Sequence, residues 1–170
     1  MSELSKLKLM EIANRIPLFK ALTLHEKEQI IAIKNIVKII KKGTKFIVYG
    51  DHDDGFYILL NGSASVYRND KKIAVVKSGQ FVGEVGFICR EPRSASVIAD
   101  TNLITFFFTR ECFLSLSLVL RDKVKDELIG GLVGRIQEMT EEIDRLERAA
   151  SIFRDEPKAP VSDIELPTGS

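Results

Sequence analysis

The chain has 170 residues, of which 45% are apolar and 29% charged, and its 25 basic and 24 acidic residues leave a net charge of +1. A chain of this length and balance can bury a core of its own, which excludes wholesale disorder and a collagen-like repeat. The small net charge argues against nucleic-acid binding through bulk charge. The charge is nevertheless uneven, because residues 1–45 carry ten Lys and Arg against four acids, whereas residues 138–165 carry nine acids against four bases.

The two cysteines, Cys89 and Cys112, are too few for a disulfide framework. We expect each to be a small buried hydrophobic residue in a reducing, cytoplasmic setting. The N-terminal segment lacks the apolar core of a signal peptide, and the longest uncharged apolar stretch, residues 112–120, is too short to span a bilayer. The sequence therefore predicts no membrane insertion.

The N-terminal part of the chain is predicted to be helical. Apolar spacing indicates helices over residues 3–15 and 23–34, with a turn at residues 16–19 between them. Thr23 followed by Glu26 forms the pattern of a capping box, in which each side chain accepts a hydrogen bond from a free N–H group at the start of the helix.

From residue 37 to residue 108 the pattern changes to short runs rich in β-branched and aromatic residues, with turn signals between them. The six runs are Phe46–Tyr49, Phe56–Leu60, Ser63–Tyr67, Ile73–Val76, Ala95–Ala99 and Leu103–Phe108. The pairs Asn61-Gly62 and Asn69-Asp70 are typical of tight hairpins. Many short strands at regular spacing indicate an all-β barrel, sandwich or roll.

After Arg110 the apolar period lengthens to that of a helix. A heptad seam follows, made of Ile129, Leu132, Ile136, Met139, Ile143, Leu146 and Ala150. The stripe is narrow, which favours a two-stranded coiled coil, and hence a homodimer through residues 129–150, over a helix packed on its own domain. Three glycines, at 130, 131 and 134, each cost the helix about 1 kcal/mol relative to alanine and permit a bend or a close backbone approach.

Residues 81–97 hold the motif that carries chemistry. Gly83 and Gly86 allow a tight turn whose exposed N–H groups at the start of a short helical turn can bind an anion. Arg93 supplies a planar cation suited to a bidentate grip on phosphate. Glu84 would be repelled by a phosphate, but it can accept hydrogen bonds from a sugar hydroxyl a few ångströms away.

At these residues the chain resembles the cyclic-nucleotide-binding domain family, which includes protein kinase A regulatory subunits, cyclic-nucleotide-gated channels and the bacterial catabolite activator protein. The family's phosphate-binding cassette runs Phe-x-Gly-Glu-aliphatic, a short helix, then Pro-Arg-small-Ala-Ser/Thr-aliphatic, and residues 81–97 fill every one of those positions. The segments Gly50–Gly62 and Ile16–Leu22 are similar to two further family motifs. Together the resemblance covers residues from about 10 to 150.

The resemblance implies a mainly β fold with flanking α: an eight-stranded, jelly-roll-like β-roll with N-terminal helices and a long C-terminal helix. The expected divisions are N-terminal helices at residues 1–35, the β-roll with its cassette at 36–109, two helices with the heptad seam at 110–150, and a flexible tail at 151–170.

The resemblance also implies a ligand, cyclic AMP or cyclic GMP. Glu84 would hold the ribose 2′-hydroxyl and Arg93 the cyclic phosphate, while the backbone at Gly83, Val85 and Ala95 would complete the phosphate cradle.

Ser94 stands where many cyclic-GMP-binding members of the family have threonine, protein kinase A subunits have alanine and the catabolite activator protein has serine. It therefore does not decide the base, and we favour cyclic AMP. The purine is expected to contact Ile73 and Ala74 on the inner face of their run and to be capped by the C-terminal helix. Arg135 and Thr140 are the polar candidates for the cap, and either is alternatively an ordinary surface residue of the coiled coil.

Other functions are disfavoured by what the motifs require. The segment Asp51–Gly55 fails as a calcium loop because its glycine is fifth rather than sixth, and two histidines are too few for a cupin metal site. No phosphate-loop or dinucleotide glycine signature and no marked nucleophile–base pair is present, so we expect no enzyme, no catalytic cofactor and no metal. The Pro-rich, mostly acidic residues after 150 are too few for a helix-turn-helix, so no DNA partner is expected.

Two hypotheses of different classes remain. In the first, the chain is a cyclic-nucleotide receptor that couples binding in the roll to the position of the C-terminal helix and to an effector protein that the sequence does not name. In the second, it is a nucleotide-free module of the same fold that serves dimerisation or protein interaction.

Overall fold

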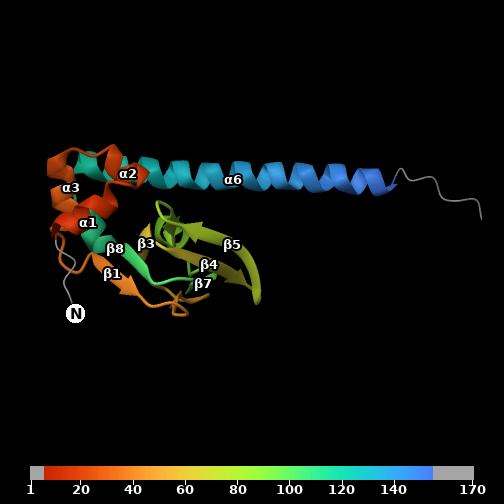
Figure 1. Cartoon of the computed structure of the whole chain (residues 1–170), viewed down its shortest axis with the longest axis horizontal. Coiled ribbons are helices and arrows are strands. Elements are labelled where there is room, and N and C mark those ends of the chain that lie inside the picture. The colour runs from red at the N-terminus through yellow and green to blue at the C-terminus, as the bar shows by residue number, and fades with distance from the viewer. Residues whose placement is uncertain (1–5, 155–170) are drawn as a thin grey trace, which may run out of the picture. The chain divides into compact units, whose positions relative to one another are not determined.

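The computed structural model describes residues 6–154, drawn as a ribbon in Figure 1. The helices are α1 Lys6–Ala13, α2 Pro17–Lys20, α3 Leu24–Ile31, α4 Glu84–Cys89, α5 Arg110–Ser115 and α6 Leu118–Arg154. The strands are β1 Val37–Ile40, β2 Lys45–Ile47, β3 Gly55–Asn61, β4 Ser63–Arg68, β5 Lys71–Lys77, β6 Phe81–Val82, β7 Ser96–Ala99 and β8 Leu103–Thr109. The fold class expected from the sequence is confirmed.

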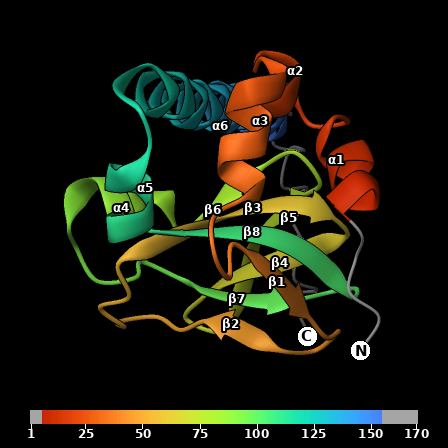
Figure 2. The ribbon, with the colours of Figure 1, turned by 90° about the vertical axis from the view of Figure 1, so that its left-hand side faces the viewer.

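Two four-stranded antiparallel sheets form the roll, in the orders β1-β8-β3-β6 and β2-β7-β4-β5. Each of the six predicted runs overlaps a strand, and two strands were not among them. The two missed strands lack a clear sequence pattern. In β1, Lys38 and the exposed Ile39 interrupt the alternation expected of a half-buried strand, and β6 has only two residues. Figure 2 shows the β1-β8-β3 layer lying between the helices and the β2-β7-β4 layer.

The two predicted hairpins have different outcomes. Asn69 and Asp70, with φ of 50° and 59°, connect the paired strands β4 and β5, as expected. The prediction for Asn61-Gly62 was wrong, because β3 and β4 belong to different sheets and this turn carries the chain from one sheet to the other. A Cβ atom at Gly62 would collide with the turn before β8, so glycine is required there for close backbone packing as well as for its φ of 91°.

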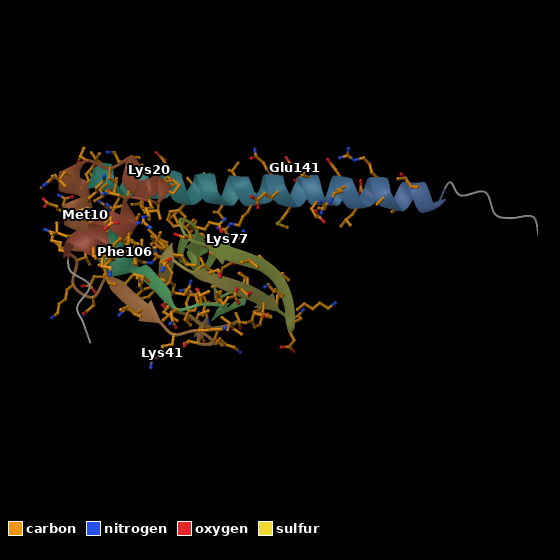
Figure 3. The ribbon with its side chains drawn as sticks, viewed as in Figure 1. Met10, Lys20, Lys41, Lys77, Phe106 and Glu141 are labelled. Carbon is orange, nitrogen blue, oxygen red and sulfur yellow. The ribbon has the colours of Figure 1, made fainter. Side chains whose placement is uncertain are left out.

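Two apolar clusters make the core. One lies between the helices and the first sheet, where the Phe19 and Phe106 rings are 5.4 Å apart and the Phe56 and Phe108 rings stack at 5.1 Å. Figure 3 shows Phe106 where β8 meets the helical layer, with Lys41 and Lys77 at the periphery of the roll. The other cluster fills the space between the two sheets and includes Leu59, Val82, Val97 and Leu103, all buried. The cassette described below adjoins this second cluster through Val82 and Val97.

The N-terminal layer follows local sequence signals. The capping box of Thr23 and Glu26 is present in full, with the Thr23 hydroxyl accepting from the Glu26 N–H and the Glu26 carboxylate accepting from the Thr23 N–H. The turn predicted at residues 16–19 is instead the one-turn helix α2, because Pro17 occupies its first position, where a missing N–H costs nothing.

Helix α6 is continuous through its three glycines and runs to Arg154, past the boundary at residue 150 expected from the sequence. Its first part buries Leu120, Val124 and Leu128, four residues apart, against the rest of the domain. The chain divides into two compact units between Leu132 and Val133. No helix among the described residues is long and apolar enough to cross a membrane. Of the flexible tail predicted at residues 151–170, the first four residues are helical, and residues 155–170 lie outside the described part of the chain.

An ion pair joins the start of α6 to α3. The Lys123 ammonium donates to both carboxylate oxygens of Glu26 at 2.8 Å, and the Glu26 side chain is only 13% exposed. These bonds from Lys123, followed by the one from the Thr23 N–H, lower the pKa of Glu26. The pair therefore holds the long helix against the N-terminal layer.

We predict that Glu26→Gln, which leaves the capping box able to form, lowers the free energy of unfolding by about 1 kcal/mol at neutral pH because it removes a partly buried charge pair. Since the folded pKa of Glu26 is lowered, its contribution is fully present above the unfolded pKa and is lost as the pH falls through the folded pKa. Urea unfolding at a series of pH values should show the wild type and the variant converging in acid.

The matched control is Glu11→Gln, which removes an exposed carboxylate whose partner, Arg15, lies one helical turn away. This change should alter the stability little at any pH. A gap between wild type and Glu26→Gln that stays constant from neutral to acidic pH would contradict the assigned role of the Glu26 charge.

Candidate phosphate-binding site

The cassette starts where β6 ends. Gly83 has a φ of +83°, a left-handed conformation that glycine adopts without strain, and it caps the N-terminus of α4. Its carbonyl oxygen accepts from the Phe87 N–H at 3.3 Å and from Nη1 of Arg93 at 2.5 Å. A Cβ atom at Gly83 would lie 2.5 Å from that same Nη1, so only glycine leaves room for the arginine.

Arg93 lies almost wholly inside the protein, with 3% of its surface exposed. Its Nη2 donates to the Asp53 carboxylate at 2.8 Å and to the Gly55 carbonyl at 2.6 Å, in addition to the Nη1 bond to Gly83. The backbone of Arg93 is also fixed, since its N–H donates to the Asp51 carbonyl and its own carbonyl accepts from the Gly50 N–H, both at 2.8 Å. The guanidinium is thus held in one place by the loop before β3 and the turn after β6.

One nitrogen of this guanidinium makes no hydrogen bond to the described residues. The Nε of Arg93 is buried and has no hydrogen-bond partner within the described part of the chain. A buried N–H without an acceptor costs free energy, and a phosphate oxygen would remove that cost with a charge-assisted bond. The structure therefore leaves, among the described residues, an unpartnered donor on the residue for which the sequence predicts phosphate contact.

The other predicted site residues surround Arg93 with different exposure. Glu84, the first residue of α4, is 1% exposed and is therefore buried beside the cassette turn. Val85 and Ser94 are exposed and Ala95 is partly buried. The structure joins Gly83 and Arg93 by a direct hydrogen bond, and the sugar and phosphate roles of all six predicted residues stay predictions.

The two predicted base contacts, Ile73 and Ala74, are neighbours on β5, and both are exposed. The pairing of β4 with β5 shifts its register between Ala74 and Lys72, so regular alternation along the strand does not assign these two side chains to opposite faces. Val76, further along the strand, is buried in the cluster between the sheets. The roles of Ile73 and Ala74 as base contacts stay predictions.

The two predicted capping residues, Arg135 and Thr140, lie on α6 beyond Leu132, in the second of the two units. The Thr140 hydroxyl donates to the Ile136 carbonyl one turn earlier on its own helix, at 2.9 Å. Their role as base contacts stays a prediction.

Sequence reasoning treated Asp51–Gly55 as a plain polar turn and so missed three contributors to the site. Asp53 supplies the carboxylate for Arg93 and Gly55 supplies a carbonyl, while Asp54 accepts from Nε of Arg110 at 2.7 Å. The sequence did contain a signal for these contacts. Asp53 and Asp54 directly precede a predicted buried strand, and the cassette arginine, Arg93, needs a carboxylate partner if it is buried. Which carboxylate would meet which arginine depends on the pairing of β3 with β8, and no local pattern encodes that pairing.

Arg110, the first residue of α5, links the cassette to the helices. Its Nη2 donates to the Phe87 carbonyl at 2.5 Å, and its guanidinium lies 4.5 Å from the centre of the Phe87 ring. The Phe87 ring also packs edge-on against Phe113 of α5, at 5.4 Å. Figure 2 shows α4 and α5 side by side at the same end of the roll. The cassette helix is thereby held directly against the first helix after the roll.

The remaining groups considered are possible metal ligands and the two cysteine thiols. Among the described residues, no cluster of three or more His, Cys, Asp or Glu side chains could hold a metal ion. The expectation that both cysteines are buried was wrong for Cys89, which is exposed at the end of α4. Cys112 is partly buried, and this burial raises the pKa of its thiol, which lowers its fraction of reactive thiolate at neutral pH.

Residues 37–118 match the family model described as the cyclic nucleotide-binding domain. This match spans the whole roll and α5, and it contains the cassette with Gly83 and Arg93. The resemblance seen in the motif is therefore confirmed, and the roll of this chain belongs to the cyclic-nucleotide-binding domain family.

Among known proteins, a cGMP-dependent protein kinase of Plasmodium berghei is 41% identical over 64 residues, covering 38% of this chain and 8% of the kinase. A cAMP-dependent protein kinase regulatory subunit of Candida albicans is 33% identical over 96 residues, covering 56% of this chain and 21% of the subunit. The chain thus spans 8% and 21% of the length of these two relatives. A cyclic nucleotide-binding domain from Methylobacillus flagellatus has a similar fold, with a TM-score of 0.66, 26% identity and 79% coverage of each chain.

We predict that Gly83→Ala destabilises the protein more than Gly43→Ala. Both glycines have a left-handed φ, +83° and +82°, so alanine pays about 1–2 kcal/mol for the conformation at either position. Only at Gly83 does the new methyl group also press on the Arg93 guanidinium, whereas nothing lies within 4 Å of the Cβ position at Gly43. Chemical denaturation of the two variants measures the difference, and equal losses would contradict the close packing of Gly83 on Arg93.

Proposed function

We propose that this chain is a cyclic-nucleotide receptor, a regulatory module without catalytic activity of its own. The observation that carries the proposal is the buried Arg93 guanidinium, held at the cassette turn by Gly83 with its Nε donor unused. In the bound state, the cyclic phosphate would accept from Nε of Arg93 and from backbone N–H groups at Val85 and Ala95. Glu84 would accept from the ribose 2′-hydroxyl.

Cyclic AMP is the ligand that we favour over cyclic GMP. Ser94 is compatible with either nucleotide. The two kinase relatives do not decide the matter, because one is named for cGMP and the other for cAMP. The purine would lie against β5 and contact Ile73 and Ala74.

Binding is proposed to bias the position of α6, so that an effector protein can read the signal. Arg110 and Phe87 offer a route, since they tie the cassette helix α4 to the start of α5. The division of the chain at Leu132 falls among the α6 glycines, which we propose as the hinge. Allosteric coupling requires that nucleotide binding and the position of α6 each affect the equilibrium of the other, as this proposal supposes.

The part of α6 after the hinge is proposed to form a homodimer. Its seam residues are exposed, with 62% of Ile136 and 53% of Ile143 accessible in the single chain. Every seam position from Ile129 to Leu146 is apolar, as the interface of a coiled coil requires. With only two cysteines in the chain, a reducing, cytoplasmic compartment remains our expectation.

The alternative, a nucleotide-free interaction module, has one observation in its favour. Asp53 already neutralises Arg93 at 2.8 Å, so the buried cation has a counter-charge without any ligand. A thermal-shift screen with cyclic AMP, cyclic GMP and cyclic dinucleotides separates the two functions. Stabilisation by a cyclic mononucleotide supports the receptor, whereas the absence of a shift with every ligand supports the alternative.

We predict that Arg93→Lys weakens cyclic AMP binding at least tenfold. The lysine keeps the charge but loses the planar fork, and hydrogen bonds to charged groups contribute roughly 1.5–3 kcal/mol each. Isothermal titration calorimetry with cyclic AMP and cyclic GMP makes the measurement, after circular dichroism has shown that the variant is folded. The matched control is Arg90→Lys, an exposed arginine of the same cassette, which should bind as the wild type does. Unchanged affinity in Arg93→Lys would overturn the assignment.

We predict that Ile136→Lys together with Ile143→Lys converts the dimer into a monomer. Lysine places a charge on the seam, where two helices would otherwise bury apolar surface against each other. Light scattering gives the mass of the particle in solution. A dimer that survives both substitutions would show that its interface lies outside this seam.

A further inference from the structure

The residues beside the exposed apolar stripe on α6 bear on whether the second helix of the proposed homodimer runs parallel or antiparallel to the first. Beyond Leu132 the seam residues are solvent-exposed within the described part of the chain, with 65% of Met139 and 59% of Leu146 accessible. In the heptad frame, Ile129, Ile136 and Ile143 occupy position a, and Leu132, Met139 and Leu146 occupy position d. The positions flanking this seam, e and g, face the partner helix in any two-stranded coiled coil, and their charges set the orientation of the strands.

The flanking charges are few and unevenly placed. Arg135 and Glu142 occupy successive g positions, and Thr140 and Glu147 occupy successive e positions. In a parallel pair, each g residue faces the e residue of the next heptad on the other strand. Glu142 would then face Glu147 of the second copy on both sides of the dimer, and Arg135 would face the uncharged Thr140. A parallel dimer therefore has two like-charge contacts and no attractive one at these positions.

An antiparallel pair reverses this balance. In that arrangement g residues face g residues, so Arg135 faces Glu142 of the second copy, and the symmetry of the dimer makes this contact twice. The same register stacks the six seam residues from Ile129 to Leu146, with Ile129 against Leu146, Leu132 against Ile143, and Ile136 against Met139 of the second copy. Building on the homodimer proposed above, we propose that α6 pairs with a second copy of itself in this antiparallel register.

Two further charges bear on this register. Glu142 also accepts from Arg145 on its own helix, and its two carboxylate oxygens allow it to serve both arginines. Glu147 would approach Asp126 of the second copy, but only beyond the last seam layer, at the solvated end of the overlap. Exposed like charges of this kind cost little and are screened by salt. The central pair of Arg135 and Glu142 therefore decides the direction.

A charge-swap experiment on the full chain tests the proposal. Arg135→Glu alone and Glu142→Arg alone each place like charges opposite each other, and sedimentation equilibrium at low salt should show a dimer dissociation constant raised about threefold or more in each. The double variant restores two attractive pairs, so its dissociation constant should return to the wild-type value. Glu141→Arg changes the same charge on the outer face of the helix, at the position labelled in Figure 3, and should leave the constant unchanged. A constant that is unchanged in Arg135→Glu and lowered in Glu142→Arg overturns the register, because in a parallel dimer Arg135 faces the uncharged Thr140 and Glu142→Arg replaces a repulsion from Glu147 by an attraction.

Disulfide trapping reads the direction without relying on charge. In a background of Cys89→Ser and Cys112→Ala, an antiparallel dimer brings Ile129→Cys of one copy beside Leu146→Cys of the other. The two copies of Leu146→Cys then lie about 25 Å apart along the helix axis. Mild oxidation should therefore cross-link the mixture of the two variants and leave Leu146→Cys alone uncross-linked. Efficient self-cross-linking of Leu146→Cys would establish a parallel dimer and overturn the proposal.

The outcome is separable from that of the proposed receptor function. A wild-type chain that is monomeric at all accessible concentrations overturns both the dimer and its direction, while cyclic AMP binding measured by calorimetry is unaffected by that result. Conversely, loss of the nucleotide assignment leaves the cross-linking pattern and the charge-swap cycle as they are.

Discussion

The roll depends on the burial of one permanently charged side chain, Arg93. Moving a charge from water into a protein interior costs several kcal/mol unless other groups replace its hydration. Here a carboxylate and two carbonyl oxygens, from Asp53, Gly55 and Gly83, take the place of water on both terminal nitrogens. These acceptors come from strands of the first sheet and from the loops beside them, so the guanidinium fixes the cassette to that sheet.

Several features of the chain follow from that constraint. Gly83 must be glycine because a side chain there would collide with the guanidinium. Gly55 must be glycine for a related reason, since its Cβ would lie 2.5 Å from the Phe107 ring, and only close packing there keeps its carbonyl within reach of Arg93. The unused Nε is the remaining imbalance. An anion is the simplest group that would accept a hydrogen bond from this nitrogen, so the structural role of Arg93 and its proposed binding role fall on one residue.

Helix α6 combines two environments in one continuous element. Up to Leu128 its apolar face is covered by the domain, and Lys123 pairs with Glu26 on α3. After Leu132 a stripe of the same apolar character has no cover within the described part of the chain. A helix that packs on its own domain at one end and exposes an apolar stripe at the other could couple the proposed nucleotide binding in the roll to a partner protein.

The sequence alone determined most of the elements and the motif. Six strands, the capping box and the cassette could be read locally, because alternation, capping and glycine conformation are properties of neighbouring residues. Only the tertiary structure decided which carboxylate meets Arg93 and that Asn61-Gly62 joins two sheets rather than the two strands of a hairpin. Each of these depends on which strands pair and in which register, and pairing between strands far apart in the chain is set by the packing of the whole roll.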